Sequence, residues 1–145
     1  MKQIEPHLIW IGHAGDGRNV TALYDAGIVA VIQLAIEEPT AQLPREFISL
    51  RFPLLDGDGN DADHLRLAIR SVATSIESRI PTLVCCSAGM SRSPAIVAAA
   101  LALISGDDRD RMLEMVASHR PADVSPALWA AISQSLENAS GRPAG

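Results

Sequence analysis

Short apolar runs alternate with longer amphipathic segments along this chain of 145 residues. Three of the runs are rich in aliphatic residues, have the length of strands and end at or near small or polar residues. They lie at residues 8–12, 28–34 and 82–85. A fourth segment, residues 47–52, alternates between apolar and other residues and is followed by Pro53. This pattern predicts four strands, with the fourth closed by the proline.

Helical periodicity fills most of the space between these strands. The clearest case has apolar residues at spacings of four, three and four, namely Leu65, Ile69, Val72 and Ile76. Such spacing places them on one face of a helix, and Asp61 or Asp63 is placed to cap its start. A shorter helix is expected over residues 20–26, stopped by Gly27.

The remaining helices follow the last strand. Ser93 is expected to cap an alanine-rich helix that starts with Pro94 and runs to Ile104. Asp107 or Asp108 is expected to cap the next helix, which Pro121 ends. A final helix restarts at residues 125–126. The inward-facing residues of these two helices are expected to be Met112, Met115, Val116, Leu128, Ile132 and Leu136.

Strands separated by helices predict an α/β fold with a mostly parallel central sheet flanked by helices. We expect a single domain over residues 1–137 and a flexible tail over residues 138–145. Apolar residues make up 48% of the chain, which is ample for one core.

The charge balance narrows the function classes. The chain has 12 Lys and Arg against 17 Asp and Glu, a net charge of −5, and no basic cluster. Nucleic acid and acidic membranes are therefore not the expected partners. The start has no apolar signal segment, and the apolar run 95–104 is too short to span a bilayer. With two adjacent cysteines and no disulfide framework, we expect a cytoplasmic protein.

The most informative stretch is residues 83–94, where an apolar strand leads through small residues to a helix start. Such a turn gathers backbone N–H groups in one concavity, and the helix dipole adds positive potential. Cys86 at its floor is expected to be a thiolate, and the Arg92 guanidinium suits two phosphate oxygens. The amides expected to hold phosphate belong to Ser87, Ala88, Gly89, Met90, Ser91 and Arg92.

Cys86 and Arg92 form a C-x5-R motif followed by Ser93 and Pro94. With its glycine and serines, the motif resembles the signature of the cysteine-dependent protein tyrosine phosphatases, most closely their dual-specificity branch. The resemblance extends, more weakly, over residues 4–133. It implies a phosphatase that needs no metal or other cofactor and acts on phosphorylated proteins or peptides.

The resemblance also implies roles for individual residues. Cys86 would attack phosphorus to give a phosphocysteine, and Arg92 with the loop amides would neutralise the equatorial oxygens. Ser93 would donate a hydrogen bond to the departing thiolate. Asp56 lies 30 residues before Cys86 and is the expected general acid, with Asp58 as the alternative.

Two features leave other interpretations open. Cys85 stands where the family usually has histidine, and it is either a core residue or a redox partner of Cys86. The loop of residues 56–61 begins like a calcium-binding EF-hand, but Asp61 and Leu67 stand where that motif requires Gly and Glu.

The substrate class is the least determined part. Ala88 and Met90 carry no charge, which argues against inositol lipids, and 3% aromatic content argues against a deep phosphotyrosine slot. A shallow site for phosphotyrosine, and for phosphoserine or phosphothreonine, is expected. The alternatives are a phosphatase for RNA 5′ ends, nucleotides, sugars or lipids, and a catalytically silent phosphate-binding module.

Overall fold

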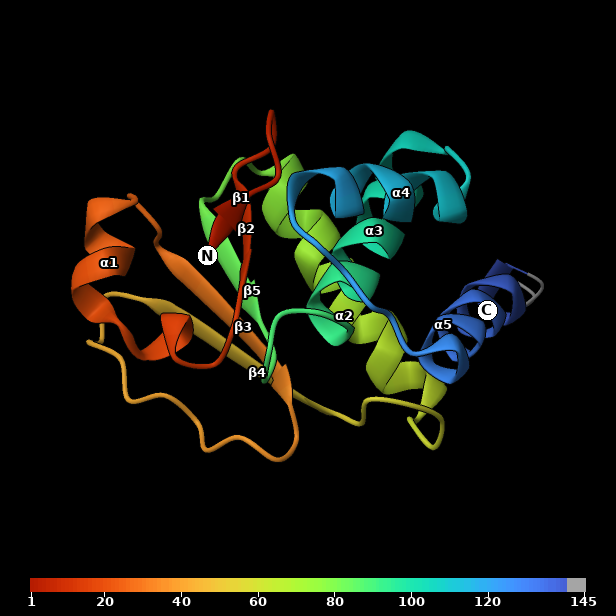
Figure 1. The fold of residues 1–145 in the computed structure, drawn as a ribbon, viewed down its shortest axis with the longest axis horizontal. Coiled ribbons are helices and arrows are strands. Elements are labelled where there is room, and N and C mark those ends of the chain that lie inside the picture. The colour runs from red at the N-terminus through yellow and green to blue at the C-terminus, as the bar shows by residue number, and fades with distance from the viewer. Residues whose placement is uncertain (141–145) are drawn as a thin grey trace.

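A five-stranded sheet runs through the centre of the computed structural model, which describes residues 1–140 (Figure 1). The strand order is β1-β2-β5-β3-β4, and all neighbours are parallel except the antiparallel β1–β2 pair. The strands are β1 (Lys2–Gln3), β2 (Ile9–Gly12), β3 (Ala30–Ala35), β4 (Ile48–Leu54) and β5 (Thr82–Cys85). The predicted α/β fold with a mostly parallel sheet is confirmed, and β1 is an addition to it.

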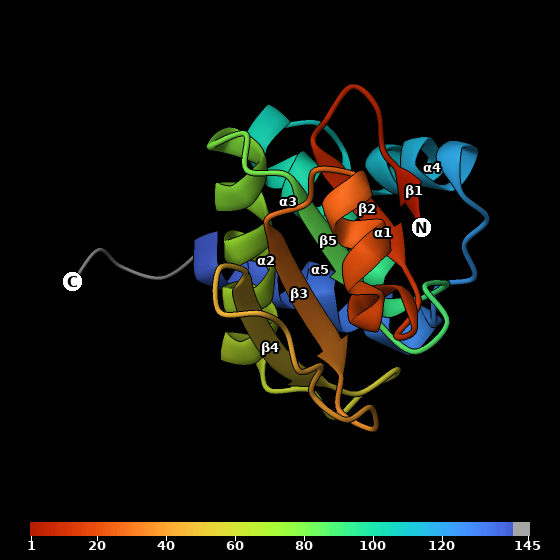
Figure 2. The same ribbon diagram turned by 90° about the vertical axis from the view of Figure 1, so that its left-hand side faces the viewer.

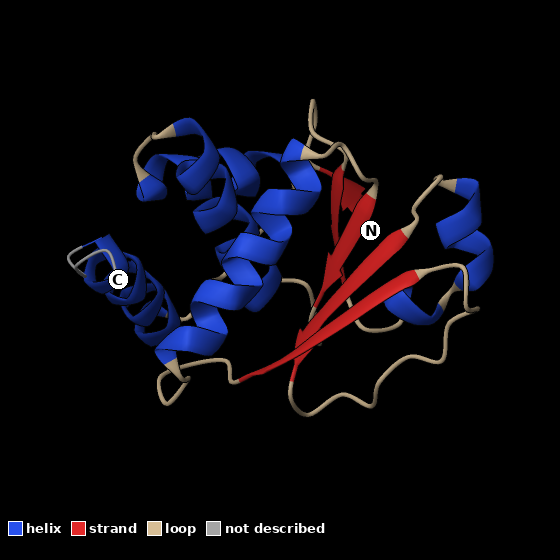
Figure 3. Ribbon diagram, turned by 180° about the vertical axis from the view of Figure 1, so that it is seen from behind, coloured by secondary structure: helices blue, strands red, loops and turns tan. Residues whose placement is uncertain are grey.

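Helices cover both faces of the sheet unequally. Figures 1 and 3 show α2, α3, α4 and α5 gathered on one side and α1 on the other, and Figure 2 looks onto the face that α1 covers. The helices are α1 (Val20–Asp25), α2 (Ala62–Glu77), α3 (Arg92–Ser105), α4 (Arg109–His119) and α5 (Pro126–Ser140), with a 3-10 turn, η1 (Asp16–Arg18). No helix in the described part of the chain is long and apolar enough to cross a membrane.

The sheet separates two apolar clusters. The larger contains the buried side chains of α2 and α3, and every residue from 92 to 102 is buried. The smaller lies under α1 and includes Val31, Leu83 and Cys85. Because successive strand residues point to opposite faces, Cys85 joins the smaller cluster and Cys86 the larger one.

The fourth strand differs from its prediction. It runs through Pro53 to Leu54 and does not stop at the proline. The reason is its position: β4 is an edge strand that pairs only with β3, so a missing N–H is tolerated on its open side. The extra length brings residue 55 and the acidic loop after it to the carboxyl edge of the sheet.

The start of α3 also corrects the sequence prediction. Ser91, not Ser93, occupies the N-cap position, and Arg92 already lies in the first turn. Pro94 is therefore the third helical residue, where its missing N–H is still harmless because the first turn has no internal acceptors. Because α3 starts at Arg92, the backbone of this residue lies at the positive, N-terminal end of the helix dipole.

Other helix boundaries follow the sequence signals. Asp61 caps α2 through Oδ1, which accepts hydrogen bonds from two amides, and Asp108 caps α4. Gly27 and Gly106 follow α1 and α3 with φ of 75° and 76°. The segment expected to be a tail, residues 138–145, begins within α5, which runs to Ser140. Residues 141–145 of this segment lie outside the described part of the chain.

Candidate active site

The loop of residues 86–91, called the phosphate loop below, follows β5 at the carboxyl edge of the sheet. Four of its carbonyls accept hydrogen bonds of 2.7–3.3 Å from outside the loop. The donors are the Ala14 amide to Ser87, Nη2 and Nε of Arg120 to Ala88 and Gly89, and the Asp123 amide to Met90. The carbonyls are thus turned outward, and the amides of residues 87–91 donate to no group in the described chain. A ring of donors without acceptors favours an oxyanion ligand.

Gly89 is required by this turn. Its φ is 73°, and an added Cβ would lie 2.6 Å from Nη2 of Arg120 and 2.7 Å from the carbonyl oxygen of Gly12. Both the positive φ and the close backbone approach exclude a side chain. The absence of a side chain at Gly89 therefore lets Arg120 and the end of β2 contact the backbone of the phosphate loop.

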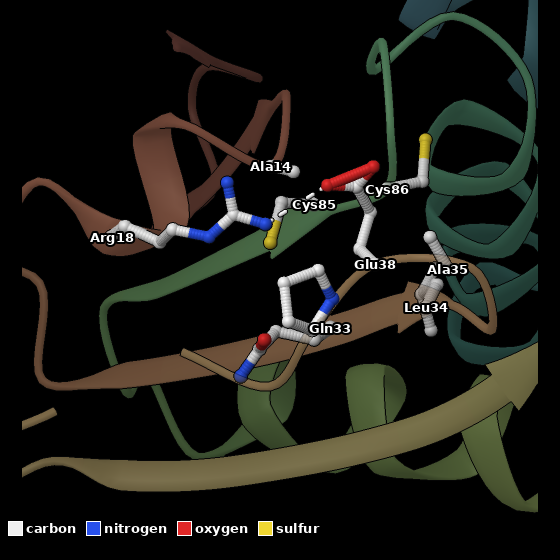
Figure 4. A pocket seen from close by; sticks show the side chains of 9 residues that line it. Ala14, Arg18, Gln33, Leu34, Ala35, Glu38, Cys85 and Cys86 are labelled. Carbon is white, nitrogen blue, oxygen red and sulfur yellow. Dashed lines mark hydrogen bonds and ion pairs between the residues drawn. The ribbon is translucent and has the colours of Figure 1, made fainter. Parts of the chain in front are cut away.

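Cys86 and Cys85 point to opposite sides of the strand end, as Figure 4 shows. Cys86 is 4% exposed and lies at the base of the phosphate loop. Cys85 packs against Gly17, where a Cβ would lie 2.9 Å from its Sγ, and burial raises the pKa of its thiol to about 12. This arrangement fits a core residue and gives no support to the alternative of a redox partner.

Arg92 is buried and held by the loop after β3. Its Nη1 and Nη2 donate to the two carboxylate oxygens of Glu37 at 2.6 and 2.7 Å, and Nη1 also donates to the Leu54 carbonyl at 2.9 Å. These hydrogen bonds lower the pKa of Glu37 to about 2. Nε of Arg92 and Oγ of Ser93 are buried and have no hydrogen-bond partner in the described chain. Two buried polar groups in the first turn of α3 thus lack a partner.

A second glutamate stands beside Glu37. Oε2 of Glu38 lies 3.3 Å from Oγ of Ser87, and Oε2 of Glu37 lies 3.1 Å from the same oxygen. Glu38 also pairs with Arg18 at 2.9 Å. Neither glutamate was predicted from the sequence, because residues 36–46 show neither periodicity nor a motif, and Arg18 was not predicted because it lies in a short turn, η1. The acidic doublet directly after a buried strand was the available signal.

Asp56 reaches the phosphate loop through Ser91. Oγ of Ser91 donates to Oδ1 of Asp56 at 2.6 Å and accepts a hydrogen bond from the Ser125 amide at 2.9 Å. The loop that carries Asp56 is held by Asn60, whose side chain bonds both the amide and the carbonyl of Leu55. Asp58 makes no hydrogen bond or ion pair in the described chain, so only one of the two candidate acids contacts the loop.

A small pocket opens beside the two cysteines (Figure 4). It is lined by Ala14, Arg18, Gln33, Leu34, Ala35, Glu38, Pro39, Cys85 and Cys86. Across the described residues, no three His, Cys, Asp or Glu side chains come together in a way that could hold a metal ion. The groups present at this edge are a thiol, a guanidinium, backbone amides and a carboxylic acid.

Comparison with known proteins agrees with this geometry. Residues 12–106 match the family described as "Polymorphic toxin system, DSP-PTPase phosphatase". The chain belongs to this dual-specificity phosphatase family of the cysteine-based protein tyrosine phosphatase superfamily.

Individual relatives support the same assignment. Mouse dual specificity phosphatase 28 is 30% identical over 124 residues, which cover 84% of this chain and 76% of the relative. The crystal structure of human DUSP28 has a TM-score of 0.83 at 23% identity and covers 99% of this chain and 100% of that one. A mouse putative dual specificity phosphatase complexed with zinc tungstate has a TM-score of 0.79 at 27% identity and covers 94% and 86%.

Proposed function

We propose that this chain hydrolyses phosphate monoesters on proteins, at phosphotyrosine and also at phosphoserine or phosphothreonine, through a phosphocysteine intermediate. Family membership supports phosphatase chemistry in general. The observation that carries the proposal is the phosphate loop itself: outward carbonyls, amides with no internal acceptor, and a buried Nε of Arg92 without a partner. Together they form a preorganised oxyanion site above Cys86.

The first step transfers the phosphoryl group to sulfur. The Cys86 thiolate attacks phosphorus in line, so that an S–P bond forms while the bond to the leaving oxygen breaks. Asp56, in its protonated form, gives its proton to that oxygen. The loop amides and Arg92 stabilise the charge that spreads over the three equatorial oxygens.

The second step regenerates the enzyme. Asp56, now a carboxylate, takes a proton from water, and the water oxygen attacks phosphorus as the S–P bond breaks. Inorganic phosphate leaves with the added oxygen, and sulfur returns as a thiolate. Oγ of Ser93, buried and without a partner in the described chain, can donate a hydrogen bond to that thiolate.

The oxyanion in one relative bears on the same proposal. The mouse putative dual specificity phosphatase was crystallised with zinc tungstate, and tungstate is a tetrahedral oxyanion like phosphate. We expect tungstate and vanadate to compete with substrate here, because both place oxygens where the amides and Arg92 can donate.

Turnover of an aryl phosphate such as p-nitrophenyl phosphate tests this function. We expect measurable turnover that vanadate inhibits and that Cys86→Ser abolishes while phosphate-ester binding persists. Cys85→Ala is the matched control, since it removes the neighbouring thiol on the other face of the strand and should retain turnover. Activity in Cys86→Ser would rule out the phosphocysteine.

Two observations favour a second candidate, a phosphate-binding module without turnover. Cys85 replaces the family's usual histidine, and Arg92 is already engaged by Glu37 in a bidentate pair. Such a module would bind phosphopeptides or vanadate without releasing phosphate. Measuring binding by calorimetry alongside turnover separates the two, and a panel with phosphorylated RNA, lipids and sugars tests the non-protein substrates.

A further inference from the structure

Two carboxylates stand at the rim of the phosphate loop. Glu37 and Glu38, together called the acidic rim, approach the single hydroxyl of Ser87 at 3.1 and 3.3 Å. One hydroxyl hydrogen serves only one of these acceptors, so the two carboxylates lie close together and depend on Arg92 and Arg18 for charge compensation. The Glu37 side chain is 53% exposed, so a bound substrate can reach it.

The rim lies beside groups that point to an anionic ligand. The Arg92 side chain is 4% exposed, yet its Nε has no partner in the described chain, and the same holds for the buried hydroxyl of Ser93. A phosphate in the loop would take the Nε hydrogen bond on one edge of the guanidinium. Glu37 occupies the edge formed by Nη1 and Nη2. Phosphate and Glu37 would then share one positive charge.

Substrate binding therefore shifts the local charge balance. Before binding, Glu37 is neutralised by Arg92 and Glu38 by Arg18. Phosphate adds up to two negative charges beside the Cys86 thiolate. Arg18 is already paired with Glu38, whereas Arg120 and Arg51 donate to neutral carbonyls and belong to neither ion pair of the rim. Glu37 cannot relieve the excess by taking up a proton, since its pKa is about 2.

From this geometry we infer that the acidic rim selects phosphoproteins that carry Lys or Arg beside the phosphorylated residue. When bound phosphate shares the positive charge of Arg92, that charge no longer fully compensates Glu37. The Lys or Arg side chain of the substrate then supplies the missing positive charge. The inference rests on the proposed phosphatase function and names its substrate class. Polyanions, such as RNA ends or acidic phosphopeptides, would bring further negative charge to the rim and are disfavoured.

The test uses the full chain and three phosphotyrosine peptides that differ only at the positions flanking the phosphotyrosine, which are Lys, Gln or Glu. We expect kcat/KM to fall in that order, with about a tenfold difference between the Lys and Glu peptides at low salt. The ratio should shrink in 0.5 M NaCl, because salt screens exposed charges.

Variants locate the effect. Glu37→Gln with Glu38→Gln should reduce the Lys-to-Glu ratio to about threefold or less, since the rim then carries no charge. The matched control is Glu77→Gln with Glu114→Gln, which removes two exposed charges on α2 and α4 and should keep the ratio. The ratio within each variant is the readout, so a general loss of rate does not mimic the effect.

The outcomes separate this inference from the proposed function. Aryl phosphate turnover with equal rates on the Lys and Glu peptides would overturn the inference and leave the phosphatase standing. Faster hydrolysis of a 5′-phosphorylated oligonucleotide than of the Lys peptide would also overturn it. If no turnover occurs, the phosphatase proposal fails, and calorimetry on the same peptides then tests the charge preference of the acidic rim. Tighter binding of the Lys peptide than of the Glu peptide supports this preference, and equal binding refutes it.

Discussion

The hydroxyl of Ser91 donates a 2.6 Å hydrogen bond to Oδ1 of Asp56 and so joins the phosphate loop to the loop after β4. The same hydroxyl oxygen accepts a hydrogen bond from the Ser125 amide at 2.9 Å. With its acceptor side occupied, the Ser91 proton is directed to Asp56. Ser91 is thus a positioning residue for the proposed general acid and links it to the start of α5.

Ser91→Ala tests this link. We expect a three- to tenfold loss of kcat/KM on phenyl phosphate, a poor leaving group, and a smaller loss on p-nitrophenyl phosphate, whose leaving oxygen needs less protonation. Asp56→Asn should show the same dependence more strongly. Ser71→Ala, a half-buried serine on α2, is the control. Equal losses on both substrates would assign Ser91 to loop stability alone.

Gly89 offers a sharp test of the loop backbone. Gly89→Ala should lose vanadate binding and destabilise the fold by about 1–3 kcal/mol, because the Cβ has no room and φ is 73°. Gly57→Ala is the matched control, since nothing lies within 4 Å of its Cβ position. Urea unfolding and vanadate titration check both variants, and wild-type behaviour of Gly89→Ala would contradict the loop geometry.

Arg120 holds two loop carbonyls outward from behind. Arg120→Met keeps the aliphatic stem but removes the hydrogen bonds to Ala88 and Gly89. We expect vanadate to bind about tenfold more weakly, since the amides lose their fixed direction. Arg111→Met, on the exposed side of α4, should bind vanadate as the wild type does. Unchanged affinity in Arg120→Met would show that the loop is held without it.

The sequence predicted the fold well because local signals and global packing agree. Strand and helix periodicities placed β2, β3, β5 and α1 to α5 within a few residues. The errors arose where tertiary context decides. Pro53 lies inside β4 because that strand is an edge. Ser91 and not Ser93 lies at the N-cap position of α3, and its side chain bonds Asp56 and does not cap the helix.

The site was predictable in part for a similar reason. Cys86 and Arg92 belong to one contiguous motif, so sequence alone brings them together. Glu37 lies 55 residues from Arg92, and Arg120 lies 31–32 residues from its partners in the phosphate loop. No local pattern encodes such pairs. The roles of Asp56 and Ser93 in catalysis stay predictions, although the contact of Asp56 with Ser91 favours it over Asp58.

Thiol reactivity distinguishes the two cysteines. Burial raises the pKa of Cys85 to about 12, so its thiolate is scarce at pH 7–9. We expect iodoacetamide to modify Cys86 alone in the native protein at that pH, and vanadate to protect it. Mass spectrometry of the digested protein reports the site. Modification of Cys85 at a comparable rate would place its sulfur in a more open environment than the core beneath α1.

The Glu37–Arg92 pair predicts an acid-sensitive contribution to stability. Arg92 lowers the folded-state pKa of Glu37 from 4.5 to about 2, so the carboxylate form stabilises the fold above pH 4.5. This contribution is lost as pH falls from 4.5 through 2. Because the carboxylate is half exposed, we expect only about 1 kcal/mol.

Urea unfolding at pH 6 and pH 2.5 measures this loss. Glu37→Gln should be less stable than wild type at pH 6, and the difference should narrow at pH 2.5, because the wild-type carboxylate is then largely protonated in the unfolded chain but not in the folded one. Glu114→Gln, whose carboxylate forms no ion pair in the described chain, should track the wild type at both pH values. A gap between Glu37→Gln and wild type that stays constant with pH would mean that the side chain acts through packing and not through its charge.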